Sequence, residues 1–262
     1  MLARIASEFG HTVYSIGLPD VPGVKAFSSG NADTSWIKVL PMPIAEYDGM
    51  IPAPLVKGNI PVDRVADFLR GSVWGGSAGA ELTSTLKRNG AKLINPNDIE
   101  AYAVPNAALS AEGAIVSALT RYPGSAYSSR VLIIGYGRIA RVLARLLQSW
   151  GADVMVVARD PVARAWAQAD GHHAADMDAL TQMASTCDIL FQTAPAMLIN
   201  RNVIDSMRPG TYVSDLTRGG IDIEAAEAHG LVAWRDSGIP GKYAPEASAR
   251  YLYDIILRGD SK

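Results

Sequence analysis

The chain has 262 residues, 48% of them hydrophobic and 19% charged, with a net charge of -2 at pH 7. This is the composition of a globular protein that is long enough for two modest cores. Nearly balanced charges give no reason to expect nucleic acid or an anionic membrane as a partner, so a small-molecule site fits better. A lone cysteine, Cys187, excludes a disulfide within the chain. With no signal-peptide core and no apolar run of about 18 residues, we expect a cytoplasmic protein.

Short apolar runs alternate with stretches of helical periodicity, which is typical of a parallel sheet covered by helices on both faces. In the first half, the predicted strands are residues 12–18 and segments near Gly49, Ser72 and Lys92, and the predicted helices are 1–9, 62–70 and 80–89. A doubly wound domain normally opens with a strand, whereas this chain opens directly in a helix. We therefore expect a first domain without its first strand, and a natural start upstream of Met1.

A polar link at residues 125–130 marks the expected domain boundary. It follows a helix predicted to begin near Ser110 and a Pro-Gly turn. The predicted domains are residues 1–122 and 123–262, and we expect the final helix, 245–257, to pack back toward the first domain. In the second half, strands are predicted at 130–137, 152–159, 187–195, 211–217 and 231–238, with helices between them. The predicted class is α/β, with two doubly wound, Rossmann-like parallel-sheet domains.

The most informative motif is an apolar strand, residues 131–134, followed at once by GYGRIA and an amphipathic helix. The first glycine allows the tight turn, the second lets the backbone approach a pyrophosphate, and the small alanine permits close packing of helix on strand. The helix start offers free N–H groups and a positive dipole end to phosphates. Such turns also occur for packing alone. The predicted cofactor-binding residues here are Gly135, Gly137, Arg138, Ile139 and Ala140.

The end of the next strand bears on the choice between NAD and NADP. An NAD site usually has an acidic residue about 20 residues after the turn, where it holds the ribose hydroxyls. This chain has Arg159 there, and a guanidinium can pair with a 2′-phosphate. We therefore favour NADP. Asp160 leaves two alternatives open, because it is either the N-cap of a helix that begins at Pro161 or a ribose ligand in an NAD enzyme.

Later strand ends should face the same crevice, since ligands bind outside the carboxyl ends of such strands. We expect Thr193, Ala194 and Pro195 to wall the nicotinamide ribose. Arg218 is placed to bind a substrate carboxylate, and its alternative is a solvated loop residue. The segment from Gly238 to Gly241 is either a stiff loop that approaches the ligand or a turn into the last helix. The four histidines lack metal-ligand spacing, so no metal is predicted.

Three segments together resemble the A subunit of dipicolinate synthase, a family of spore-forming bacteria. They are GYGRIARVLARLLQSWGADVMVVAR, CDILFQTAPAMLINRNVIDSMRPGTYVSDLTRGGID and DSGIPGKYAP. An upstream segment, GGSAGAELTSTLKRNGAKLINPNDIEAYAVPNAALSAEG, is also similar to that family.

This resemblance implies NADP-dependent oxidation of dihydrodipicolinate to dipicolinate during sporulation, driven forward by aromatisation of a dicarboxylate ring. It implies catalytic roles for Ser77, Glu112 and Arg218, with Gly238 and Gly241 near the substrate. Ser77 and Glu112 also have alternatives, as a turn hydroxyl and as a carboxylate at a helix N-terminus. The implied partner is a flavoprotein-like B subunit, and we also expect a homo-oligomer.

Two other functions stay open. DLTRGGID also resembles the arginine turn of D-2-hydroxyacid dehydrogenases, but no histidine follows Trp234 to serve as their late proton donor. The second is a non-catalytic NAD(P)-binding subunit. Both remain alternatives to dipicolinate synthesis.

Overall fold

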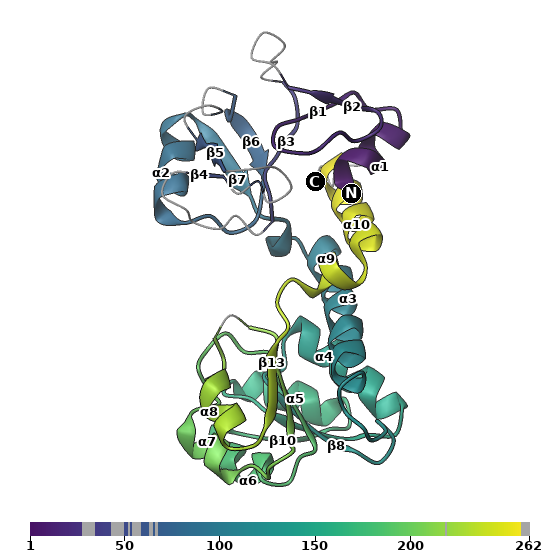
Figure 1. The fold of residues 1–262 in the computed structure, drawn as a ribbon, viewed down its shortest axis with the longest axis vertical. Helices are drawn as coiled ribbons and strands as arrows, with labels where there is room; N and C mark the ends of the chain where they lie inside the picture. The colour runs from purple at the N-terminus through teal and green to yellow at the C-terminus, as the bar shows by residue number, and fades with distance from the viewer. Residues whose placement is uncertain are drawn as a thin grey trace. The chain divides into compact units, whose positions relative to one another are not determined.

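The computed structural model describes residues 1–27, 35–42, 50–51, 53, 59–62, 65, 68–217 and 219–257. The chain divides into two compact units (Figure 1). The first unit is Met1–Ala103 with Pro245–Lys262, and the second is Val104–Ala244. The division falls inside a long helix, α3 (Glu100–Leu119), rather than at residues 122 and 123, where the sequence suggested a boundary.

The described residues of the first unit form short strands and helices. Its strands are β1 (Val13–Ser15), β2 (Val24–Ala26), β3 (Lys38–Val39), β4 (Met50–Ile51), β5 (Ile60–Pro61), β6 (Gly71–Trp74) and β7 (Ala91–Ile94). Its helices are α1 (Leu2–Glu8), α2 (Ala80–Arg88) and α10 (Pro245–Leu257), with a short 3-10 helix η3 (Pro96–Asp98). Strands β3, β6 and β7 form a parallel sheet in that order. The predicted strand near Gly49 corresponds to β4. Residues 63, 64, 66 and 67 of the predicted helix 62–70 lie outside the described residues, and the described residues 68–70 are not helical.

The last helix, α10, packs against the first helix, α1, within this unit. Ile5 and Ala6 of α1 pack against Ala249 and Tyr253 of α10, and the ring of Phe9 stacks on Tyr253 at 4.9 Å. The C-terminal segment of the chain therefore shares a core with the N-terminal segment.

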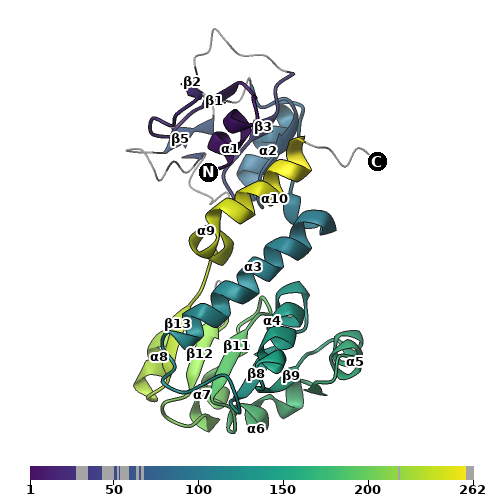
Figure 2. The same cartoon turned by 90° about the vertical axis from the view of Figure 1, so that its right-hand side faces the viewer.

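The second unit contains a six-stranded parallel sheet with the order β10-β9-β8-β11-β12-β13. Figure 2 shows β9, β8, β11, β12 and β13 of this sheet. Its strands are β8 (Arg130–Ile134), β9 (Asp153–Val157), β10 (His173–Ala175), β11 (Ile189–Gln192), β12 (Tyr212–Asp215) and β13 (Val232–Arg235). Its helices are α4 (Arg138–Ser149), α5 (Pro161–Ala169), α6 (Leu180–Ala184), α7 (Arg201–Ser206), α8 (Ile223–Ala228) and α9 (Ile239–Tyr243), with a 3-10 helix η4 (Met177–Ala179). This is the strand order of a Rossmann fold, so the predicted α/β class is confirmed.

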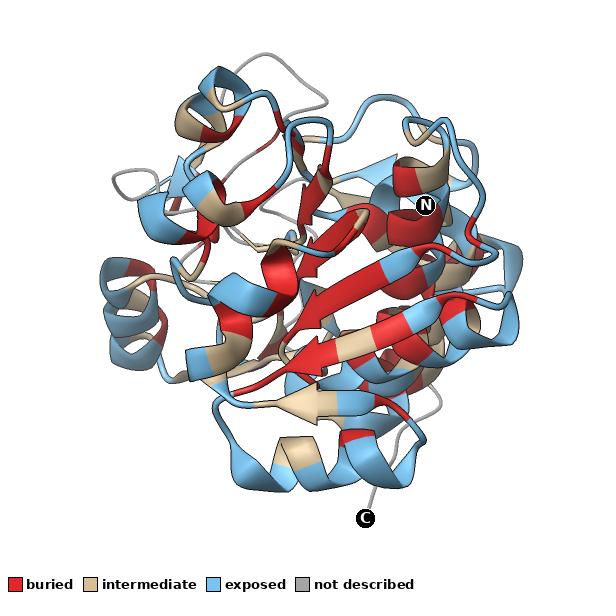
Figure 3. Ribbon diagram, turned by 90° about the horizontal axis from the view of Figure 1, so that it is seen from below, coloured by how far each residue is buried: buried red, intermediate tan, exposed pale blue. Residues whose placement is uncertain are grey.

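Both faces of this sheet are covered by helices, which explains its uninterrupted apolar strands. Val131 and Ile133 of β8 lie in the cluster formed with α3, α4 and α5. Leu132 and Ile134 face the opposite way, into the cluster formed with α6, α7 and α8. Figure 3 shows the central strands buried along most of their length. The alternating side chains of one strand thus hold two helical layers to one sheet.

Helix α3 begins at Glu100, so the expected start near Ser110 was wrong. Pro105 is a local signal for a break, because proline removes a backbone N–H and clashes with the preceding turn. In the structure, Pro105 lies inside the helix, and buried Tyr102, Ala103 and Ala107 on either side of it stabilise the continuous helix by packing. Tertiary burial therefore outweighs the local preference.

None of the helices in the described part of the chain combines the length and the hydrophobicity that a membrane crossing requires.

Candidate functional site

The strand order of the second unit reverses direction at β8. The sheet runs from β8 to β9 and β10 in one direction and from β8 to β11, β12 and β13 in the other. At such a switch point the connections leave on opposite faces, and ligands bind beyond the carboxyl ends of the two central strands. Ile134 and Gln192 are register partners at these ends of β8 and β11.

Gly135 makes the turn out of β8 and is required by the fold. Its φ is +93°, a left-handed conformation that side chains rarely adopt. A Cβ atom at Gly135 would also lie 2.8 Å from Oγ1 of Thr193. That hydroxyl donates a hydrogen bond of 2.7 Å to the carbonyl of Ile134, so β11 is held directly against the turn.

Gly137 is glycine for a different reason. Its φ of -83° suits any residue, and a Cβ there would meet nothing within 4 Å. It is the N-cap of α4 and supplies no side-chain cap, whereas Asp160, Asn200 and Asp222 cap α5, α7 and α8. The first-turn N–H groups of a helix have no partners within the helix. The start of α4 therefore combines open space, backbone donors and a positive dipole end, as a pyrophosphate requires.

The other predicted residues of this turn occupy the first turn of α4. Arg138 and Ile139 begin the helix, with Arg138 exposed, and Ala140 is fully buried against the sheet. The small side chain of Ala140 lets α4 pack closely against β8, as the motif predicts.

Tyr136, between the two glycines, anchors the turn and was not singled out in the sequence. Its hydroxyl donates a hydrogen bond of 2.8 Å to Oδ2 of Asp170, and Arg141 lies 3.5 Å from the same oxygen. Burial, followed by the hydrogen bond to Asp170, raises the pKa of Tyr136 above its ordinary value. The phenol therefore stays a hydrogen-bond donor. The motif specifies no residue type between its two glycines, so the sequence does not predict the contact of Tyr136 with Asp170.

Two arginines, Arg159 and Arg164, lie near the end of β9. Arg159 is exposed, and Arg164 of α5 donates hydrogen bonds of 2.8 Å to the carbonyls of Ala158 and Arg159. Asp160 accepts a hydrogen bond of 2.9 Å from the N–H of Val162, which confirms it as the N-cap of α5. Positive charge thus dominates the turn, while the nearby carboxylate is engaged in capping.

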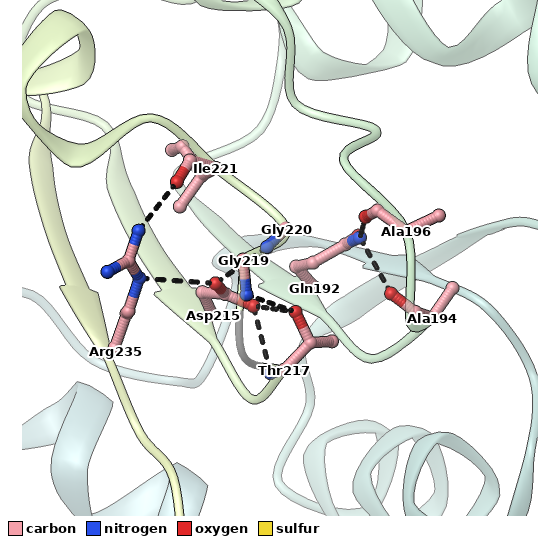
Figure 4. Close-up of polar contacts among 9 residues, drawn as sticks. All are labelled: Gln192, Ala194, Ala196, Asp215, Thr217, Gly219, Gly220, Ile221 and Arg235. Carbon is pink, nitrogen blue, oxygen red and sulfur yellow. Dashed lines mark hydrogen bonds and ion pairs between the residues drawn. The ribbon is translucent and has the colours of Figure 1, made fainter. Parts of the chain in front are cut away.

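The ends of β11 and β12 carry two buried polar side chains, Gln192 and Asp215 (Figure 4). Gln192 holds the segment that contains Thr193, Ala194 and Pro195. Asp215 holds Thr217 and Gly220, which follow it in the chain. The sequence did not identify either residue as functional. The predicted Arg218 lies outside the described residues, although Thr217 and Gly219 on either side of it are described.

The other predicted site residues are Gly238, Gly241, Glu112 and Ser77. Gly238 has a φ of +67° and caps α9, which includes the exposed Gly241, so the segment is a short helix rather than a loop. Glu112 is exposed in the interior of α3, so its alternative as a carboxylate near a helix N-terminus was wrong. Ser77 is exposed between β6 and α2 in the first unit.

Comparison with known proteins agrees with this geometry. Residues 107–232 match the family model described as "D-isomer specific 2-hydroxyacid dehydrogenase, NAD binding domain". The A subunit of dipicolinate synthase from Bacillus subtilis (strain 168) is 31% identical over 179 residues, which is 68% of this chain and 59% of that protein. This chain belongs to the family of dipicolinate synthase A subunits. The alignment thus spans 59% of the length of the curated relative.

Solved structures share the fold of this member of the dipicolinate synthase family. The crystal structure of the dipicolinate synthase A chain from Bacillus subtilis has a TM-score of 0.85, with 24% identity over 97% of this chain and 90% of that one. The corresponding structure from Bacillus halodurans has a TM-score of 0.84, with 24% identity over 98% and 92% of the two chains. D-lactate dehydrogenase from Escherichia coli has a TM-score of 0.55, with 18% identity over 72% and 74%.

The two glycines of the turn should respond differently to substitution. We expect Gly135→Ala to lower the free energy of unfolding by about 1–3 kcal/mol, because alanine is strained at a positive φ and would contact Thr193. Gly137→Ser should leave it within about 0.5 kcal/mol, because serine is a good N-cap and the space is open. Denaturant unfolding of both variants checks this, and equal losses would contradict it.

Proposed function

We propose that this chain oxidises dihydrodipicolinate to dipicolinate with NADP as the hydride acceptor. The observation that carries the proposal is the uncapped start of α4, where Gly137 leaves open space in front of backbone donors. The curated relative, the A subunit of dipicolinate synthase, supports the choice of substrate.

The residues present fit the cofactor. Gly135, Gly137, Arg138, Ile139 and Ala140 would bind the pyrophosphate and position the helix beneath it. Thr193, Ala194 and Pro195 would border the nicotinamide ribose, because they follow the strand that adjoins β8. When bound, the nicotinamide supplies the acceptor for a hydride from the substrate.

NADP is favoured over NAD by the charge at the end of β9. Arg159 is exposed there, and Arg164 fixes the carbonyls of the same turn. A guanidinium pairs well with a phosphate, whereas an NAD site normally offers a carboxylate to the ribose. The Asp160 carboxylate already caps α5, which supports assigning the 2′-phosphate to Arg159.

The substrate side is proposed from the family resemblance. Arg218 would bind a carboxylate of the dicarboxylate ring, and Gly238 and Gly241 would lie near it. Ser77 and Glu112 would complete the catalytic residues. Oxidation removes a hydride and a proton from the ring and leaves it aromatic, so the protein mainly has to position the ring against the nicotinamide.

The proposed assembly also follows the relative, which is named as one subunit of a synthase. We propose that the chain acts in the cytoplasm of a spore-forming cell, as a homo-oligomer, and that its partner is a flavoprotein-like B subunit.

A D-2-hydroxyacid dehydrogenase is the second candidate, because the matching family model is the NAD-binding domain of those enzymes. Incubating the purified chain and NADP separately with dihydrodipicolinate and with a panel of 2-hydroxy acids distinguishes the two. NADPH fluorescence that rises together with dipicolinate, measured by chromatography, supports the proposal. Turnover of 2-hydroxy acids alone supports the second candidate, and nucleotide binding without any turnover indicates a non-catalytic subunit.

Gly137→Ser should weaken NADP binding at least tenfold, about 1.4 kcal/mol, while the protein stays folded. The serine side chain would fill the open space and cap the N–H groups that a phosphate needs. Isothermal titration calorimetry measures the dissociation constant. Gly79→Ser is the matched control, because Gly79 is also an uncapped glycine N-cap, on α2 of the first unit. Unchanged affinity in Gly137→Ser would count against the phosphate role of the α4 start.

Arg159→Glu should weaken NADP binding at least tenfold more than NAD binding, because only NADP carries the 2′-phosphate. Arg145→Glu makes the same charge change on the exposed side of α4 and should spare both nucleotides. Fluorescence titration with each nucleotide provides the comparison. An equal loss of NAD and NADP affinity would remove the proposed role of Arg159.

A further inference from the structure

Two polar side chains interrupt the apolar core at the carboxyl edge of the central sheet. Gln192 is the last residue of β11 and Asp215 the last residue of β12, and the two are register partners. Both are fully buried. Burying an amide or a carboxylate is costly unless its hydrogen bonds are satisfied, so the contacts of these two residues need an explanation.

Asp215 directs its carboxylate into the loop that follows it (Figure 4). Oδ1 accepts hydrogen bonds from the backbone N–H of Thr217, at 2.9 Å, and from the Thr217 hydroxyl, at 2.6 Å. Oδ2 accepts a hydrogen bond of 2.9 Å from the N–H of Gly220, and Nε of Arg235 lies 3.8 Å away. The carboxylate thus holds both Thr217 and Gly220.

Gln192 holds the loop that follows β11, residues 193–196. Its Nε2 donates to the carbonyls of Ala194, at 2.9 Å, and Ala196, at 2.8 Å. Both partners are acceptors, so the amide orientation is fixed. Its Oε1 is buried and has no hydrogen-bond partner in the part of the chain that the structure describes. An unpaired buried acceptor lowers stability, so stability alone does not account for a glutamine at this position.

The two loops touch through Gly220. A Cβ atom at Gly220 would lie 2.4 Å from Cγ of Gln192 and 2.9 Å from Oδ1 of Asp215. A change in one anchor is therefore transmitted to the other, because no free space separates them.

We infer that Gln192 and Asp215 are positioning residues that fix residues 193–196 together with Thr217 and Gly220 for the binding of a dicarboxylate. The inference rests on the proposed function. Neither side chain lies among the residues assigned to the substrate; each holds backbone at the edge where the cofactor and the substrate would meet. Buried apolar side chains would fill the same volume without an unpaired acceptor, but they would leave both loops without anchors.

Asp215→Asn tests the pair with almost no change of shape. The amide nitrogen must face either the N–H of Gly220 or the donors of Thr217, so one anchor is lost. We expect the KM for dihydrodipicolinate and the dissociation constant of dipicolinate to rise at least tenfold, while NADP affinity stays within twofold. Hydrogen exchange of the Gly220 amide should accelerate at least tenfold. Asp222→Asn is the matched control, because it alters an exposed helix cap just beyond the loop.

Variants at Thr217 and Gln192 test the same inference if Asp215→Asn fails to fold. Thr217→Val removes the hydroxyl that donates to Asp215 and accepts from the N–H of Gly219, and it should raise the same KM. Thr217→Ser retains the hydroxyl and should restore the KM. Gln192→Met removes both anchors of residues 194–196 at similar volume, and it should also accelerate exchange at Gly220.

The outcomes separate this inference from the proposed function. Faster exchange at Gly220 together with weaker dicarboxylate binding supports the inference. Faster exchange with unchanged dicarboxylate binding overturns it, as does unchanged exchange. If the wild-type protein neither turns over dihydrodipicolinate nor binds dipicolinate, the proposed function fails and the inference fails with it. If the wild type is active and the folded variants bind equally well, only the inference fails.

Discussion

The second unit depends on the close approach of β11 to the turn that leaves β8. Thr193 donates hydrogen bonds to the carbonyl of Ile134 from both its hydroxyl and its backbone N–H, and a Cβ at Gly135 would lie only 2.8 Å from that hydroxyl. Gly135 also has a left-handed φ of +93°, which glycine adopts without strain. This contact fixes the direction of α4 and brings the ends of the two central strands together.

Two kinds of constraint act along this edge of the sheet. At Gly135 and Gly220, neighbouring atoms leave no room for a side chain, so glycine is required for packing. At Gly137, the fold itself makes no such demand, because the backbone is ordinary and the space is empty. Gly219 and Gly241 share these two features, but of the three only Gly137 begins the helix that follows β8, where folds of this kind bind a pyrophosphate. The difference is visible only once the neighbours of each glycine are known.

Much of the fold could be predicted from the sequence where the signal is local. The turn after Ile134 combines an apolar strand, spaced glycines and an amphipathic helix, and each of these is set by sterics within a few residues. The start of α3 was missed because Pro105 is a local break signal, and the packing that overrides it comes from residues distant in sequence. Local patterns are therefore reliable only where tertiary contacts agree with them.

The site was harder to predict than the fold. A lone glutamine or aspartate at a strand end resembles any polar residue at the start of a loop, so Gln192 and Asp215 gave no sign of full burial. The role of Tyr136 could not be predicted from the sequence either, because its hydrogen-bond partner Asp170 lies 34 residues away at the end of α5. Sequence patterns locate the backbone that meets a ligand, whereas the side chains that hold this backbone become apparent only from three-dimensional contacts.

The uncapped start of α4 links the folding of the unit to its ligand. In α5, α7 and α8 the cap side chain accepts a hydrogen bond from a backbone N–H of the first turn, but α4 has no such acceptor. An anion seated there would replace the missing cap and would bind the native state alone. At a ligand concentration of 100 times the dissociation constant, such binding adds about 2.7 kcal/mol to the free energy of unfolding. The melting temperature of this unit would then rise with the concentration of free nucleotide.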